Sequence, residues 1–190
     1  MSDSSPTPRR VRRTRRTLVL GGARSGKSAF AEGLAADPGP VRYLATAVLD
    51  PADLDFAERI ARHRDRRPAD WTVVESADPT AVLTDSVSAA AAGATLIDDV
   101  GTWLTARIDA RAAWESPRGT IAPDTDAFVG AVEAYAHRLV IVSPEVGMGV
   151  IPATRSGRLF RDEIGTLNQR LAAICDEVFL VVAGLPIHLK

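Results

Sequence analysis

An eight-residue run near the N-terminus, Gly21-Gly22-Ala23-Arg24-Ser25-Gly26-Lys27-Ser28, fits the pattern G-x-x-x-x-G-K-[ST] of a loop that binds nucleotide phosphates. Glycines let such a loop wrap closely around an anion with its amides pointing inward, and the following helix adds its positive end. In this pattern Lys27 neutralises the β- and γ-phosphates, and Ser28 binds Mg²⁺. The apolar run Thr17–Leu20 and the helical pattern after the loop give the required strand–loop–helix order. The chain is therefore predicted to bind a nucleoside triphosphate.

A second acidic element is expected beside this loop, because phosphate-loop enzymes hold Mg²⁺ with a carboxylate at the end of an apolar strand. The run Thr95-Leu96-Ile97-Asp98-Asp99 supplies it. Asp98 directly follows the apolar residues and is the predicted metal-binding carboxylate, with Asp99 in reserve. An aspartate after a strand is also a common turn former, so the residues alone leave that structural role open.

One of the three histidines, His63, lies among arginines in the run Arg62-His63-Arg64-Asp65-Arg66-Arg67. Spacings of seven and three from Phe56 and Ile60 place it on the apolar face of a predicted helix. A neutral imidazole can attack the α-phosphorus of a nucleotide and expel pyrophosphate, and nearby guanidinium groups would disfavour protonation of the ring. A partly buried histidine with a structural role is the simpler interpretation of these residues taken alone.

Short apolar runs alternate with longer segments of helical period, which predicts an α/β domain with a mostly parallel sheet flanked by helices. The predicted strands are Thr17–Leu20, Val41–Thr46, Trp71–Glu75, Thr95–Asp98, Leu139–Ser143 and Val178–Val182. The predicted helices are Lys27–Ala36, Ala52–Arg64, Thr80–Ala91, Trp103–Arg111, Asp124–His137 and Ser156–Cys175. Residues 113–123 contain two prolines and a glycine and are predicted to form a surface loop.

The length of 190 residues and the hydrophobic fraction of 46% suit one well-buried core rather than two domains. No apolar run approaches the roughly 18–20 residues that span a membrane, and the single cysteine, Cys175, excludes a disulfide framework, so a cytoplasmic location is expected. Residues 1–16 hold six arginines and are predicted to be a disordered tail, with one nucleotide-binding catalytic domain over residues 17–190. The tail could instead contact nucleic acid or a membrane surface.

Several blocks along the chain together resemble the family of bifunctional adenosylcobinamide kinases/adenosylcobinamide-phosphate guanylyltransferases of cobalamin biosynthesis. The resemblance covers essentially residues 17–190. The blocks are the phosphate loop, Tyr43-Leu44-Ala45-Thr46-Ala47, Arg59-Ile60 leading to His63, Arg67-Pro68 and Trp71, Glu145-Val146-Gly147-Met148-Gly149-Val150-Ile151-Pro152, Phe160-Arg161-Asp162, Gly165, Asn168-Gln169-Arg170-Leu171-Ala172 and Asp176-Glu177-Val178. Generic phosphate-loop proteins do not carry the block that begins at Glu145.

The resemblance implies a RecA-like P-loop NTPase fold and two activities. The family phosphorylates the aminopropanol hydroxyl of adenosylcobinamide with ATP or GTP, and then transfers GMP from GTP to that phosphate through a guanylylated histidine. By motif position the nucleophile falls on His63. The family's guanine-nucleotide contacts fall on Gly21, Gly22, Ala23, Arg24, Ser25, Gly26, Lys27, Ser28, Thr46, Ala47, Val48, Arg64, Asp65, Arg66, Arg67, Glu75 and Asp98. The implied partners are a corrinoid substrate and copies of the chain in a homotrimer, with no nucleic acid and no membrane span.

The sequence leaves two alternative functions open. A plain small-molecule kinase would leave His63 unmodified, and a nucleotide switch or nucleic-acid-binding ATPase would use the arginine tail as an arm.

The remaining candidate residues have structural interpretations as well. Arg155, Arg158, Arg161 and Arg170 could clamp phosphates or form a solvated helix face, Glu145 could belong to the site, His137 should end a helix, His188 should be solvated, and Cys175, Trp71 and Trp103 should pack.

Overall fold

The computed structural model describes residues 16–36, 39–46, 68–76, 78–85 and 93–190. Within this part of the chain, one sheet contains seven strands in the order β3-β2-β4-β5-β1-β6-β7. All neighbouring strands are parallel except β6 and β7, which are antiparallel. The strands are β1 (Arg16–Gly21), β2 (Val41–Ala45), β3 (Thr72–Glu75), β4 (Ala94–Asp98), β5 (Leu139–Pro144), β6 (Glu177–Val182) and β7 (Leu185–His188).

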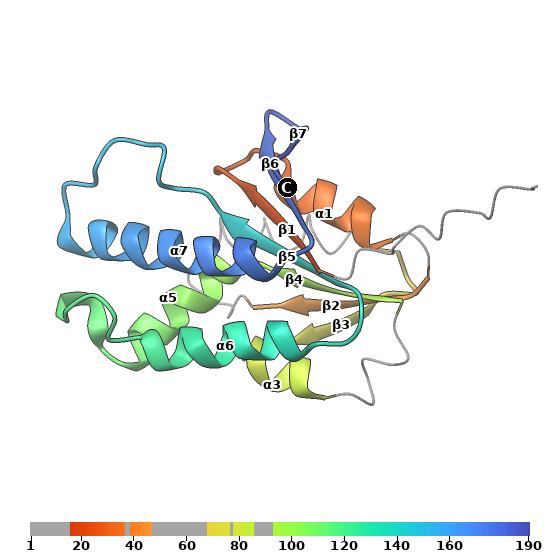
Figure 1. The fold of residues 1–190 in the computed structure, drawn as a ribbon, viewed down its shortest axis with the longest axis horizontal. Helices are drawn as coiled ribbons and strands as arrows, with labels where there is room; N and C mark the ends of the chain where they lie inside the picture. The colour runs from red at the N-terminus through yellow and green to blue at the C-terminus, as the bar shows by residue number, and fades with distance from the viewer. Residues whose placement is uncertain (1–15, 37–38, 47–67, 77, 86–92) are drawn as a thin grey trace, which may run out of the picture.

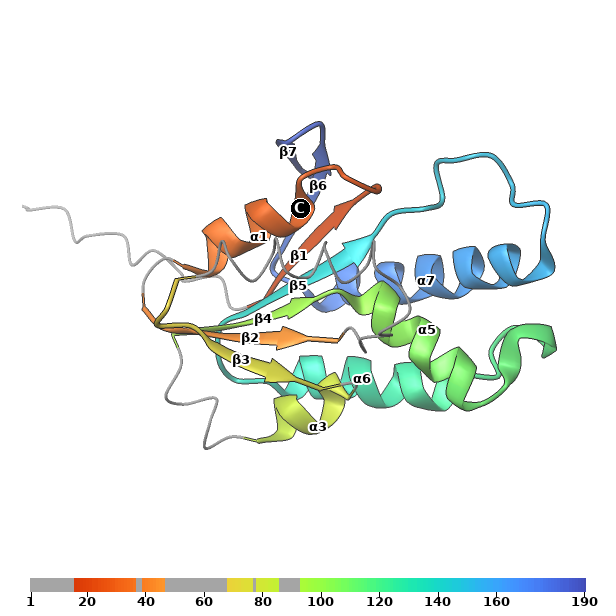
Figure 2. The ribbon, with the colours of Figure 1, turned by 180° about the vertical axis from the view of Figure 1, so that it is seen from behind.

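Helices cover both faces of this sheet, as Figures 1 and 2 show. One buried cluster joins the sheet to α1, and a larger one joins the opposite face to α3, α5, α6 and α7. The helices are α1 (Lys27–Ala35), α3 (Pro79–Thr84), α5 (Val100–Ala110), α6 (Ala122–Ala134) and α7 (Arg155–Ile174), with a 3₁₀ turn η1 (Ala113–Glu115) after α5. The predicted α/β architecture with a mostly parallel, helix-flanked sheet is therefore confirmed.

The strand β1 shows why its sequence is apolar at consecutive positions. Leu18 and Leu20 belong to the larger cluster, whereas Val19 between them packs in the cluster beneath α1. Successive side chains of a strand point to opposite faces, so a strand covered on both sides needs an apolar residue at every position. This burial fixes the strand that leads into the phosphate loop.

The predicted strands are present with small changes at their ends, and one strand was missed. β1 begins at Arg16, which was assigned to the tail, because its backbone amide donates to the Asp176 carboxylate and its guanidinium to the carbonyl of Glu133. The missed strand β7 follows a tight turn at Ala183–Gly184 and pairs with β6. The predicted helix 52–64 and the tail 1–15 lie outside the described residues.

Three predicted helices differ at their ends. α5 begins at Val100 rather than Trp103, because Asp99 caps its N-terminus by accepting from the amide of Thr102. α6 runs from Ala122 to Ala134, so the expectation that His137 ends this helix was wrong. α3 ends at Thr84, well before the predicted end at Ala91, whose neighbourhood lies outside the described residues.

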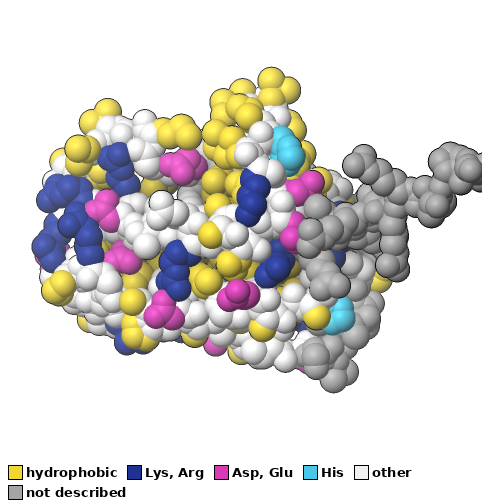
Figure 3. All heavy atoms as spheres, in the orientation of Figure 1, with side chains coloured by type: hydrophobic (Ala, Val, Ile, Leu, Met, Phe, Trp, Pro, Cys, Tyr) yellow, Lys and Arg dark blue, Asp and Glu magenta, His cyan; other side chains and the backbone are white. Residues whose placement is uncertain are grey.

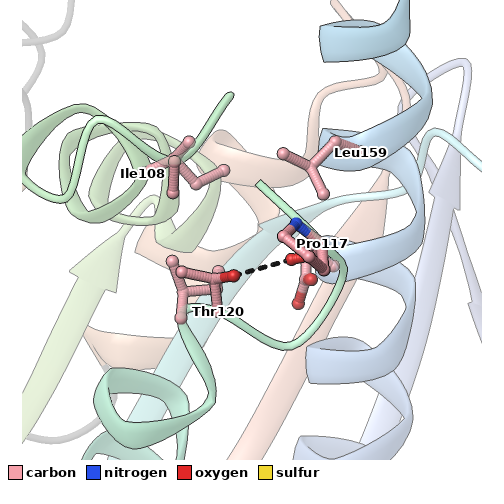
Figure 4. A pocket seen from close by; sticks show the side chains of 7 residues that line it. Ile108, Pro117, Thr120 and Leu159 are labelled. Atoms are coloured by element: carbon pink, nitrogen blue, oxygen red, sulfur yellow. Dashed lines mark hydrogen bonds between the residues drawn. The ribbon is translucent and has the colours of Figure 1, made fainter. Parts of the chain in front are cut away.

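The predicted surface loop at 113–123 is partly regular. It contains η1 and the first two residues of α6, and it is held by a hydrogen bond from the Thr120 hydroxyl to the carbonyl of Pro117, 2.8 Å long. Figure 4 shows an apolar indentation there between Ile108 of α5 and Leu159 of α7. It is too narrow for a water molecule, so it is a packing detail rather than a ligand site.

The packing predictions for three residues are confirmed. Trp103 is fully buried against Phe128, Trp71 packs beside Tyr43, and Cys175 is buried at the end of α7. His188, predicted to be solvated, is exposed and lies over the ring of Phe179. None of the described helices is long and apolar enough to cross a bilayer.

Burial of Cys175 predicts a pH dependence of stability. Burial raises the pKa of its thiol from 9.0 to about 12. Between pH 9 and pH 12 the thiol therefore ionises in the unfolded chain and stays protonated in the folded chain. Stability is therefore fully retained below pH 9 and lost as the pH rises above it, by about 1.4 kcal/mol at pH 10. Urea unfolding at pH 8 and pH 10 should show this loss in the wild type and not in Cys175→Ala. An equal loss in both proteins would contradict it.

Candidate active site

The phosphate loop connects the end of β1 to the start of α1 in a tight curve. A side chain at Gly21 would lie 2.4 Å from the Ser25 hydroxyl and 2.9 Å from the carbonyl of Val181. Gly26 has a φ of +91°, and a side chain there would approach the Cα of Gly184 to 3.1 Å. Gly21 is therefore required because a side chain would collide with its neighbours, and Gly26 because its left-handed backbone and this close approach both favour glycine.

Two neighbouring segments hold this loop in place. On one side the amide of Gly184, in the β6–β7 turn, donates to the carbonyl of Ser25 over 2.8 Å. On the other side the amide of Glu145, just after β5, donates to the carbonyl of Gly21 over 3.0 Å. The loop is thus supported from the strands on both sides of β1.

The start of α1 is suited to bind an anion. The first hydrogen bond of this helix runs from the amide of Phe30 to the carbonyl of Gly26, and no side chain caps its N-terminus. Its first amides therefore keep their hydrogen-bonding capacity for a ligand. The Lys27 ammonium reaches back over the loop and donates to the carbonyl of Gly22 over 3.3 Å, which places a positive charge at the same end of the helix.

A hydroxyl and a carboxylate meet beside this loop. The Ser28 hydroxyl donates to Oδ1 of Asp98 over 3.1 Å, although the two residues are 70 positions apart. The hydroxyl of the buried Tyr43, on β2, donates to Oδ2 of the same carboxylate over 2.7 Å. Sequence reasoning assigned no role to Tyr43, although it begins one of the blocks that carry the family resemblance. Its hydrogen bond orients Asp98 towards Ser28.

The arrangement fits Mg²⁺ bound together with a nucleotide. Mg²⁺ is usually held by one or two protein oxygens while phosphate oxygens and water complete its shell. Ser28 and Asp98 provide such a pair, and the described residues contain no larger group of histidine, cysteine, aspartate and glutamate that could hold an ion by itself. Asp99 does not share this position, because its carboxylate accepts from the amide and hydroxyl of Thr102.

The different surroundings of the two aspartates predict different effects of substitution. Asp98→Ala should raise the Mg²⁺ concentration required for nucleotide turnover by about tenfold or more, because one of the two protein oxygens is lost. Asp99→Ala should leave the Mg²⁺ requirement unchanged and lower the free energy of unfolding by about 1 kcal/mol through loss of the α5 cap. Mg²⁺ titrations and urea unfolding of both variants test this pair, and a reversal of the two phenotypes would contradict the assignment.

The structure gives less direct support to the other predicted nucleotide contacts. Thr46 is fully buried, and its hydroxyl donates to the carbonyl of Asp99 over 2.6 Å. Glu75 is exposed at the end of β3, on the same edge of the sheet as Asp98. Within the phosphate loop Ala23 and Arg24 are exposed, whereas Ser25 is buried. The predicted residues Ala47, Val48, His63, Arg64, Asp65, Arg66 and Arg67 lie outside the described residues.

The four arginines of α7 bond to protein groups. Arg155 pairs with Glu115, and Arg170 pairs with Asp126. Arg158 and Arg161 donate to backbone carbonyls of the loop that joins β5 to α7. These contacts indicate a structural role and do not direct the guanidinium groups to the phosphate loop. Glu145, by contrast, lies at the carboxyl ends of the strands and bonds through its amide to Gly21.

Comparison with known proteins agrees with this geometry. The sequence model of the family described as cobinamide kinase / cobinamide phosphate guanyltransferase matches residues 17–189. The chain belongs to this family. The match begins at the second residue of β1 and runs through β7, and so includes both the phosphate loop and the loop after β5.

Curated relatives of this cobinamide kinase family member are similar over nearly their full length. The bifunctional adenosylcobalamin biosynthesis protein CobP of Pseudomonas aeruginosa is 41% identical over 177 residues, which cover 92% of this chain and 97% of that protein. The proteins named CobU of Salmonella typhimurium and Escherichia coli are 37% and 35% identical, and each match covers 91% of this chain and 98% of the relative. The family resemblance predicted from the sequence blocks is confirmed.

Proposed function

We propose that this chain phosphorylates adenosylcobinamide with ATP or GTP and then transfers GMP from GTP to the adenosylcobinamide phosphate through a guanylylated His63. The observation that carries the proposal is the meeting of Lys27, Ser28 and Asp98 around the phosphate loop, in a chain that matches the family from residue 17 to residue 189. The rival nucleic-acid-binding ATPase does not account for this match.

In the kinase step, the acceptor hydroxyl oxygen attacks the γ-phosphorus of the triphosphate. The bond from the γ-phosphorus to the bridging oxygen breaks, the nucleoside diphosphate leaves, and the hydroxyl proton passes to solvent or to a base. The loop amides and the first amides of α1 hold the phosphates, and Lys27 stabilises the charge that develops on the transferred group. No residue of the described part stands out as the base.

In the guanylyltransfer step, an imidazole nitrogen of His63 attacks the α-phosphorus of GTP and pyrophosphate leaves, so a phosphorus–nitrogen bond replaces a phosphorus–oxygen bond. An oxygen of the corrinoid phosphate then attacks the same phosphorus, frees the histidine and forms adenosylcobinamide-GDP. The predicted contacts at Arg64, Asp65, Arg66 and Arg67 would place charge near the reacting phosphorus. Ser28 and Asp98 would hold Mg²⁺, which supplies charge neutralisation at the phosphates.

The remaining features of the proposal concern the setting of the enzyme. Residues 17–190 form its single catalytic domain, with the arginine-rich segment outside it. A soluble nucleotide-dependent enzyme that acts on a small corrinoid suits the cytoplasm, and the family resemblance favours a homotrimer. Light scattering on the purified chain would test the trimer, since a mass of one or two chains would contradict it.

Product analysis tests the proposed function directly. The purified chain is incubated with adenosylcobinamide, Mg²⁺ and GTP, and corrinoid products are separated and weighed by mass spectrometry. Adenosylcobinamide phosphate should appear first and adenosylcobinamide-GDP later, with one pyrophosphate released for each GMP transferred. If the phosphate accumulates without the GDP product while GTP is still present, the chain is a plain kinase.

A further inference from the structure

The loop between β5 and α7 exposes an unusual number of large apolar side chains. Val146, Met148, Val150 and Ile151 are 37%, 77%, 96% and 69% exposed, although they lie within six positions. Figure 3 shows hydrophobic side chains gathered at the upper left, where this loop leads into α7. Soluble proteins seldom gather apolar side chains on one surface unless that surface binds something. We call these four residues the 146–151 surface.

The backbone beneath the 146–151 surface is held in place by hydrogen bonds. Arg161 donates to the carbonyl of Gly147, and Arg158 donates to those of Pro152 and Ala153 over 2.9 and 2.7 Å. The buried Asn168 fixes the end of β5 just before the loop. These contacts hold the two ends of the 146–151 surface, at Gly147 and at Pro152–Ala153.

The 146–151 surface starts at the phosphate site. The strand β5 lies between β1, which leads into the phosphate loop, and β4, which ends at Asp98. The amide of Glu145, one residue before the surface, bonds to the carbonyl of Gly21. Figures 1 and 2 both show the loop leaving the sheet beside the phosphate loop and arching outward towards the start of α7. The loop therefore begins beside the site at which an acceptor hydroxyl would meet the triphosphate.

The composition of the loop between β5 and α7 favours an apolar ligand over a phosphate. The nine residues 146–154 contain no charged side chain. The cations that follow in α7 are engaged as well, because Arg155 pairs with Glu115 while Arg158 and Arg161 donate to loop carbonyls. A surface without a cation gives an anion no charge partner, whereas apolar side chains gain free energy when a bulky apolar group covers them.

We propose that the 146–151 surface is the contact surface for the corrinoid ring of the acceptor substrate. This inference rests on the proposed function. The corrin is a broad, flat macrocycle whose rim carries methyl groups and neutral amides, so it can cover the four apolar side chains while its aminopropanol arm extends to the phosphate loop. The surface thereby determines which acceptors are used and leaves nucleotide binding to the phosphate loop.

Steady-state kinetics of the kinase step on the full chain tests this inference. The double variant Met148→Ser/Val150→Ser should raise the KM for adenosylcobinamide by about tenfold or more, with the Kd for GTP unchanged. The matched control Ile187→Ser/Leu189→Ser removes two apolar side chains that are 50% and 55% exposed near the C-terminus, and its KM should equal that of the wild type. If the first variant loses GTP binding, the single change Val150→Ser, at a 96% exposed position, is judged by the same KM.

The outcomes separate this inference from the proposed function. An unchanged KM in a variant that binds GTP and turns over the corrinoid overturns the inference alone. A wild-type protein that binds GTP and does not turn over adenosylcobinamide overturns the proposed function, and the inference with it. Light scattering adds a further outcome, because a smaller assembly in the double variant would assign the surface to a second copy of the chain and overturn the inference.

Discussion

Lys27→Ala is expected to lower both the kinase and the guanylyltransfer activities by about 10³-fold while the protein stays folded. The Lys27 side chain is half-buried and donates a hydrogen bond to the carbonyl of Gly22, so its removal should cost little stability. In the proposed mechanism, however, its charge serves every triphosphate bound in the loop. Both activities should therefore fall together, which initial rates of the two steps would measure.

Arg24→Ala is the matched control for Lys27→Ala. Arg24 is a cation in the same loop, but it is exposed and precedes the helix. Its removal takes away an exposed residue among the implied nucleotide contacts but not the charge that pairs with the β- and γ-phosphates, so either activity should fall by less than about tenfold. If Lys27→Ala lowered only one of the two activities, the idea that one phosphate loop serves both reactions would be wrong.

His63→Ala is expected to separate the two activities. In the proposed mechanism the kinase step does not use the imidazole, so its rate should stay within about threefold of the wild type. The guanylyltransfer step should fall by on the order of 10⁴-fold or more, because its covalent route is removed. Adenosylcobinamide phosphate should therefore accumulate when the variant is supplied with GTP, which chromatography of the corrinoids would show.

His188→Ala is the matched control for His63→Ala, since it removes an exposed imidazole that contacts only the ring of Phe179 among the rings described. Both activities should remain at wild-type levels in it. Equal guanylyltransfer by His63→Ala and His188→Ala would contradict a nucleophilic role for His63 and favour the plain kinase.

The elements next to the nucleotide site could be predicted because local sequence determines them. Apolar runs of strand length, the glycines of the phosphate loop and the pattern after Lys27 specify β1, the loop and α1 within a residue or so. Asp98 was preferred to Asp99 because it directly follows the apolar run, and it is the aspartate that accepts from Ser28, although its metal role stays a prediction. Asp99 instead caps α5, a role that its position before a helix also allows.

Contacts between distant parts of the chain could not be predicted in this way. Arg42 carries a charge in a strand and is only 3% exposed, and its guanidinium donates to the carbonyl of Val82 in α3. Lys190, at the C-terminus, donates to three carbonyls at the end of α7. The sequence of β7, just before it, has no pattern that distinguishes it from a tail. The hydroxyl of Tyr43 reaches Asp98 across 55 positions. Only the folded sheet brings these groups together.

The blocks of the family resemblance also acquire a physical reason that the sequence alone did not provide. Arg161 and Asn168 lie on α7, far along the chain from the phosphate loop, yet both hold the segment that leaves β5 beside it. Pattern alone suggested a phosphate clamp or a solvated face for the arginines. Their donors are directed at backbone carbonyls, and this support is what fixes the 146–151 surface.

The central claim is that GTP held by the phosphate loop guanylylates His63. Covalent labelling tests this claim most directly. The wild-type chain is incubated with Mg²⁺ and GTP labelled at the α-phosphate, denatured, and digested for mass spectrometry. A GMP adduct on His63 that is labile in acid and stable in base, and that is absent from His63→Ala, is the predicted result. Folded protein that binds GTP and acquires no label would contradict the claim and leave a kinase alone.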